Sequence, residues 1–117
     1  MLSFTDADLP IKLDSASDEE LLSVPFGVVR MDRKGTVTLY NEEEARLSGL
    51  TEEQTIGYNF FRDVAPCTNN FMVAERFEEP ELDELLDYVF TYAMEPTEVT
   101  LRLITRESEL FLLVRRN

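Results

Sequence analysis

Two strand-like segments joined by a short polar turn are the feature that most restricts how this chain can fold. Segments 25–31 and 36–40 are rich in apolar and β-branched residues, and the turn 32–35 between them ends in Gly35. Glycine adopts the positive φ angles that tight hairpin turns require. The pattern therefore predicts a β-hairpin ahead of most of the chain.

Signals for two short helices follow the hairpin. Asn41 is placed to cap a helix over 42–48, whose glutamates lie near the positive end of the helix dipole, and Gly49 ends it. Segment 51–54 (TEEQ) has the spacing of a capping box, and Gly57 stops that turn.

The second half of the sequence predicts a loop, a helix and three strands. The loop is expected over 58–71 and the helix over 72–86, and the strands over 88–94, 98–105 and 109–116. Five strands with a group of helices indicate an α+β domain of the kind found in sensors. The 117 residues are enough for one domain.

The first 24 residues form an acidic leader. It carries six acidic residues and one basic residue, for a net charge of −5, and Ser17 is placed to cap a short helix. Its scattered apolar residues suggest docking on the domain, weakly because they are few: Leu2, Phe4, Leu9, Ile11 and Leu13. We therefore divide the chain into an N-terminal acidic cap (1–24) and a core (25–117). Salt is expected to screen repulsion between cap and core.

Charge and composition exclude several classes of function. The net charge is −13, so the surface repels phosphates and anionic membranes, and binding to nucleic acid is not expected. No apolar run is long enough to span a membrane, and the leader lacks the basic and apolar regions of a signal peptide. With one cysteine the chain forms no internal disulfide, and we expect a cytoplasmic protein.

The chain has no histidine, which restricts what its single cysteine, Cys67, can do. A hydrolytic cysteine normally needs a histidine partner, and a metal site would need mainly carboxylates. A lone cysteine is most often a small buried hydrophobic residue. The other interpretation is that its sulfur tethers a cofactor, a role that needs no base after loading.

Three segments resemble the photoactive yellow protein family: YNEEEARLSG, IGYNFFRDVAPCT and FTYAMEPTEV. The similarity runs in order from about Phe26 to the C-terminus, whereas the leader matches only in position and length. The resemblance implies a PAS fold, with a five-stranded antiparallel sheet, short helices on one side and an N-terminal helical cap. It also implies a bacterial blue-light receptor that carries p-coumaric acid (4-hydroxycinnamic acid) as a thioester.

The resemblance also implies a binding site. Cys67 matches the thioester cysteine, and Tyr40 and Glu44 match the two groups that hydrogen-bond the phenolic oxygen. Ser48 stands where the family usually has a threonine that supports the tyrosine. Positions that line the ring and tail of the chromophore correspond to Val29, Phe60, Val64, Ala65, Phe90, Tyr92 and Met94. From the residues alone, Glu44 would instead be a solvated helix acid, and the aromatic and aliphatic positions would be ordinary core.

Two departures from the family pattern concern the same site. Leu50 replaces an arginine that lies over the phenolic end of the chromophore in well-known members, so no guanidinium is expected there. The segment between Cys67 and Phe90 is several residues shorter than in those members, which puts the shape of that region in question.

The implied mechanism makes the protein a receptor rather than an enzyme. Light isomerises the chromophore, a neutral Glu44 donates a proton to it, and the buried charge left on Glu44 releases the cap. A downstream signalling protein, whose identity the sequence does not give, is the expected partner, and the chain is expected to be a monomer or weak dimer. The alternatives are a non-photoactive PAS-type sensory domain that binds a small ligand or a protein partner and, more distantly, a cysteine hydrolase acting on thioesters.

Overall fold

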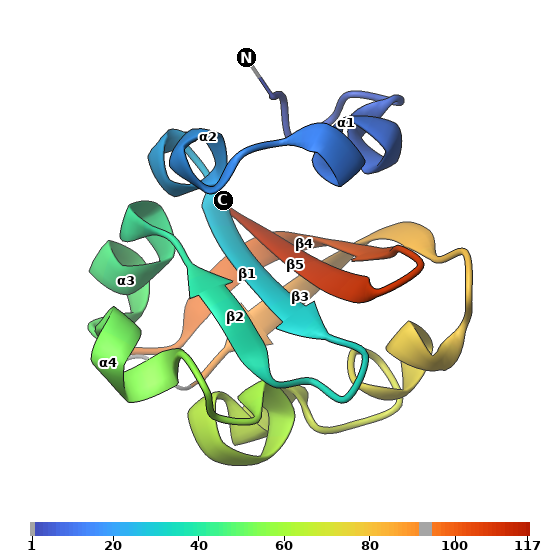
Figure 1. The fold of residues 1–117 in the computed structure, drawn as a ribbon. Coiled ribbons are helices and arrows are strands. Elements are labelled where there is room, and N and C mark those ends of the chain that lie inside the picture. Colours follow the sequence, from blue (N-terminus) through green and yellow to red (C-terminus); the bar gives the residue numbers. More distant parts are fainter. Residues whose placement is uncertain (1, 92–94) are drawn as a thin grey trace.

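The fold is built on one five-stranded antiparallel sheet (Figure 1). The computed structural model describes residues 2–91 and 95–117. The strand order is β2-β1-β5-β4-β3, and the strands are β1 (Gly27–Asp32), β2 (Val37–Tyr40), β3 (Asp83–Phe90), β4 (Thr97–Thr105) and β5 (Glu109–Arg116). The helices are α1 (Leu9–Ser15), α2 (Asp18–Ser23), α3 (Glu42–Ser48) and α4 (Glu52–Thr55), with shorter turns at Phe60–Val64, Pro66–Thr68 and Glu75–Glu78. The predicted α+β class is confirmed.

The predicted hairpin is the pair β1 and β2. The Asp32 carboxylate accepts hydrogen bonds from the backbone N–H groups of Lys34 (2.8 Å) and Thr36 (3.0 Å), and Gly35 has a φ of 91°. An aspartate and a glycine in these places close the turn without strain. The chain thereby returns along β2 to the point where α3 begins.

The predicted helix over 72–86 is wrong. Segment 83–90 is the edge strand β3, paired along its whole length with β4. Its alternation of exposed and partly buried residues has the period of a strand, and pairing with β4 outweighs the helical propensity of its Glu and Leu residues. The strand predicted over 88–94 therefore begins earlier, and residues 92–94 lie outside the described part.

The acidic leader covers one face of the sheet with α1 and α2 (Figure 1). We expected the leader to dock weakly, but most of its apolar side chains are almost completely buried. Six leader residues join a hydrophobic core on this face of the sheet, and each is at most 6% exposed: Leu2, Phe4, Leu9, Leu13, Leu21 and Val24. Ile11 is the exception, at 68% exposed.

Arginines of the sheet add polar contacts to the leader. Arg102, only 5% exposed, donates hydrogen bonds to the backbone oxygens of Phe4 (2.9 Å) and Asp6 (2.7 Å). Arg106 pairs with Asp14 (2.5 Å), and this guanidinium holds the pKa of the Asp14 carboxyl below its usual range. The leader is therefore held both by hydrophobic contacts and by hydrogen bonds and ion pairs.

Candidate functional site

The opposite face of the sheet carries the main hydrophobic core, beneath α3, α4 and the segment that contains Cys67. Six of the predicted site residues lie in this one core, each at most 7% exposed: Val29, Tyr40, Phe60, Val64, Ala65 and Phe90. Cys67 is partly buried and packs against the same core. The fold therefore brings together residues from four separate parts of the sequence.

Tyr40, Glu44 and Ser48 form the polar end of this region. The Tyr40 hydroxyl lies 2.8 Å from the Ser48 hydroxyl, and Glu44 is 1% exposed. Successive residues of α3 face different ways, so Glu42 is exposed while Glu44 points inward. A cavity beside the core is lined by Glu44, Ser48, Phe90, Val99 and Val114, together with Leu47, Thr97 and Arg116.

Two neighbours explain why α3 can carry a glutamate inward. The Asn41 side chain is fully buried, accepts hydrogen bonds from Glu44 N (3.0 Å) and Val28 N (2.9 Å), and so fixes the start of α3 against β1. Gly27 in β1 faces the Glu44 carboxyl, and a Cβ there would collide with Glu44 Oε1 and press on Val114. Glycine at residue 27 therefore leaves the space that the buried carboxyl occupies.

The backbone of Cys67 is held by two residues that sequence reasoning missed. The Tyr88 hydroxyl donates to the Cys67 carbonyl (2.5 Å), and Asn70 Nδ2 donates to the same carbonyl (3.1 Å). Tyr88 also packs edge-on against Phe90, with ring centroids 6.0 Å apart. In a strand, Tyr88 and Phe90 lie on the same face, which would have placed Tyr88 near the site. That signal was hidden because segment 83–86 reads as part of a helix.

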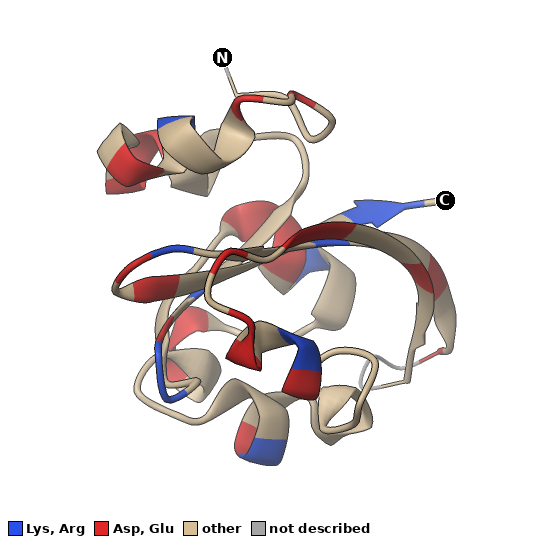
Figure 2. Cartoon of the chain, turned by 90° about the vertical axis from the view of Figure 1, so that its right-hand side faces the viewer, with Lys and Arg blue, Asp and Glu red and all other residues tan. Residues whose placement is uncertain are grey.

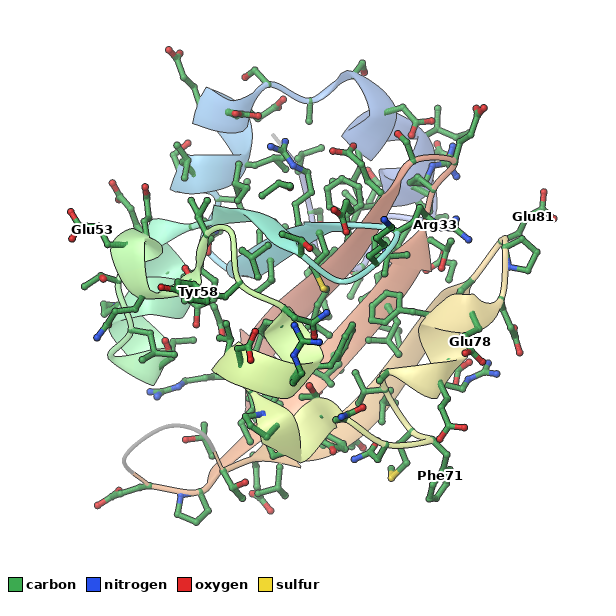
Figure 3. The ribbon with its side chains drawn as sticks, turned by 60° about the horizontal axis from the view of Figure 1, so that its bottom comes forward. Arg33, Glu53, Tyr58, Phe71, Glu78 and Glu81 are labelled. Carbon is green, nitrogen blue, oxygen red and sulfur yellow. The ribbon has the colours of Figure 1, made fainter. Side chains whose placement is uncertain are left out.

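The remaining predicted positions behave differently. Tyr92 and Met94 lie outside the described residues. Leu50 is partly buried against the main core, and its backbone N–H donates to the Ser48 hydroxyl (3.2 Å). In the short segment after Cys67, Phe71 is 71% exposed and points away from the domain (Figure 3).

The chemistry of these groups suits a molecule with an apolar body and one polar end. Hydroxyl groups and a carboxyl lie at one end of an apolar region, and the chain's only thiol borders that region. Within the described residues, no three His, Cys, Asp or Glu side chains gather as a metal site would require. No helix in that part of the chain is long and apolar enough to cross a membrane.

Comparison with known proteins identifies the family. Residues 18–110 match the family model described as PAS fold. The photoactive yellow protein of Rhodothalassium salexigens is 35% identical over 115 residues, covering 92% of both chains. That of Halochromatium salexigens is 37% identical over 103 residues, covering 85% of this chain and 82% of the relative. This chain belongs to the photoactive yellow protein family.

Solved structures agree with this assignment. The photoactive yellow protein domain of the sensor histidine kinase Ppr from Rhodospirillum centenum has a TM-score of 0.82 and 34% identity, with 92% of this chain and 99% of that chain covered. The PAS domain of an HTR-like protein from Haloarcula marismortui, at 15% identity and a TM-score of 0.67, shares the fold alone. The PAS fold expected from the sequence is therefore confirmed.

Proposed function

We propose that this protein is a bacterial blue-light photoreceptor with p-coumaric acid attached to Cys67 as a thioester. Two observations support the proposal: membership of the photoactive yellow protein family, and the packing of the only cysteine against the core that contains Tyr40 and Phe90. The residues fit the group, since its aromatic body needs apolar walls and its phenolic end needs hydrogen-bond donors.

Each polar residue has a distinct role in this proposal. The Tyr40 hydroxyl and the Glu44 carboxyl would donate hydrogen bonds to the phenolic oxygen, while the Ser48 hydroxyl, 2.8 Å from Tyr40, orients the tyrosine. Burial of Glu44 favours its neutral form, which is the form that can donate. The apolar residues, with Tyr92 and Met94 of the undescribed segment, would line the ring and tail.

The signal would arise from a proton held by Glu44. When bound, the chromophore would supply light absorption and a double bond that isomerises. Glu44 would then give its proton to the phenolic oxygen that it hydrogen-bonds, leaving a carboxylate in a position that is 1% exposed. An unpaired buried charge costs several kcal/mol, and this energy would loosen the domain where it opens most easily. We assign that opening to the leader.

Other aspects of the proposal follow from this role. The protein would act as a receptor without turnover of a substrate. Its partner would be a downstream signalling protein rather than nucleic acid, with no insertion into a membrane. We propose that it works in the cytoplasm as a monomer or weak dimer.

Reconstitution with an activated thioester of p-coumaric acid tests the proposal. The wild-type protein should gain one adduct by intact mass and a visible absorption band. Cys67→Ala should gain neither and keep its urea unfolding midpoint, because the core around the site remains. Cys67→Ser, which keeps an oxygen nucleophile, serves as the second variant and should also remain colourless.

Two results would contradict the proposal. Equal adducts on the wild type and Cys67→Ala would place the attachment elsewhere. A wild-type protein that stays unmodified and colourless under conditions that load a known photoactive yellow protein would favour the alternative, a PAS domain that senses a ligand or partner without light.

A further inference from the structure

The end of β5 places two neighbouring arginines on opposite faces of the sheet. Val114 belongs to the core beneath α3, and the Arg115 guanidinium lies on the other face, 4.9 Å from the centre of the Phe4 ring in the leader. Because side chains alternate along a strand, Arg116 returns to the face of Val114. Its strand partner is Val99, which also belongs to the main core. Figure 2 shows this basic end of β5.

Arg116 stands where the cavity of Glu44 meets the surface. It lines the inner cavity together with Glu44 and Phe90. It also lines a wider surface concavity together with Arg46 and Glu95. The two hollows share four residues: Leu47, Ser48, Thr97 and Arg116. Arg116 is therefore the only charged residue, within the described part of the chain, that lines both.

The other charged groups near this passage are already accounted for. Arg46 pairs with Glu43 (2.6 Å), and this carboxylate raises the pKa of the Arg46 guanidinium. Glu95 lines only the outer concavity. Arg116 forms no ion pair among the described residues, so its charge remains available to a negative group in the cavity.

We propose that Arg116 is a positioning residue that stabilises negative charge on Glu44 from the mouth of the cavity. Leu50, which is partly buried against the main core, gives no such help, because leucine carries no charge. The electrostatic part of this inference concerns the protein alone. Its consequence for the light response rests on the proposed function.

The protein without chromophore tests the electrostatic part. The Glu44 carboxyl is followed by carbon-13 NMR against pH in the wild type, Arg116→Gln and Arg115→Gln. The groups facing Glu44 in the titration are Tyr40 and Ser48 inside, and Arg116, Arg46 and Glu95 toward the surface. Loss of the nearby positive charge in Arg116→Gln should raise the apparent pKa of Glu44.

The expected rise is about 0.5 to 1 pH unit at low salt and less at 1 M salt, because the guanidinium is exposed and screened. Arg115→Gln removes the same charge from the same strand but from the other face, so its Glu44 curve should match the wild type. A Glu44 curve in Arg116→Gln that coincides with the wild type, whether or not a midpoint is reached, overturns the proposal. Equal shifts in the two variants also overturn it, since they would reflect net charge alone.

The loaded protein gives a second readout. Arg116→Gln should return to the dark state about three- to tenfold faster than the wild type, the equivalent of 0.5 to 1 pH unit lost by the charged form of Glu44. Arg115→Gln serves as the control in the titration, where its Glu44 curve should match that of the wild type. If the wild type never takes up chromophore, the proposed function fails, while the titration without chromophore still decides the role of Arg116.

Discussion

The two faces of the sheet are covered in different ways. On one face, the leader packs apolar side chains against Val28, Phe111 and Leu113, and its polar contacts lie around that patch. On the other face, α3 and the Cys67 segment enclose polar groups inside, including Glu44 at 1% exposed. Asn41 ties α3 to β1 through Val28 N, and its Nδ2 also donates a hydrogen bond to the carbonyl of Leu21 in the leader (3.1 Å). We expect the leader to open more readily than α3, and its opening must break this hydrogen bond as well as its contacts with the sheet.

Several strands contribute side chains to both faces, and β5 is one of them. In β5, Leu110, Leu112 and Val114 belong to the pocket-side core, while Phe111 and Leu113 belong to the leader-side core. A change in the pocket that shifts β5 therefore reaches the leader directly. This shared strand is a physical route between the faces, and the predictions below test whether the faces are energetically separate.

The largest expected effect on stability comes from replacing a buried leucine with alanine on each face of the sheet. Leu103→Ala, on the pocket side at 0% exposure, should lower the free energy of unfolding by about 2–5 kcal/mol. Leu13→Ala in α1 should lower it less, because the leader can open before the sheet. Ile11→Ala is the matched control, because Ile11 lies in the same helix and is 68% exposed. It should change the free energy of unfolding little.

Urea unfolding with hydrogen exchange measures both effects. Leu13→Ala should raise exchange over 9–23 and leave β4 and β5 protected. Should the two leucine variants lose the same stability and exchange over the same residues, the leader and the sheet unfold as one unit, and the comparison fails.

A smaller effect is expected at the hydrogen bonds that hold the leader. Arg102 donates to Asp83 (2.8 and 2.9 Å) as well as to the carbonyls of Phe4 and Asp6. Arg102→Gln should cost about 1–3 kcal/mol, because it takes the guanidinium donor from the buried Phe4 carbonyl, whereas the Asp6 carbonyl keeps the Leu9 N–H (3.1 Å). Exchange should rise at the start of the leader. Arg62→Gln is the control, because Arg62 is exposed and, within the described residues, forms an ion pair with Asp63 alone. A similar loss there would show that Arg102 has no special role.

The sequence predicted the sheet-forming segments and the helix ends well where local chemistry decides them. The caps at Ser17, Asn41 and Thr51 each accept the expected backbone hydrogen bond. Segment 72–86 was misinterpreted because its Glu and Leu residues favour a helix in isolation, and only pairing with β4 makes 83–90 a strand.

The candidate site was predictable in part. The resemblance supplied Cys67, Tyr40 and Glu44, which the fold brings to one region, although their roles stay predictions. Tyr88 and Arg116 could not be found from the sequence, because their roles depend on which face of a strand each residue occupies.

The leader combines a repulsive net charge with local ion pairs to the sheet. Its net charge of −5 beside an acidic core suggested repulsion that salt would screen. The structure also pairs Asp14 with Arg106 and Asp18 with Arg30. Salt screens both the net repulsion and these attractions, so the expectation that salt opposes release of the leader stays a prediction.

The central claim is that a charge formed in the pocket on one face releases the cover on the other. Hydrogen exchange of the loaded protein in darkness and under steady blue light tests it most directly. Exchange over residues 2–24 should be faster in the light, with β4 and β5 still protected. Unchanged exchange in the leader, or loss of protection across the sheet, would contradict it.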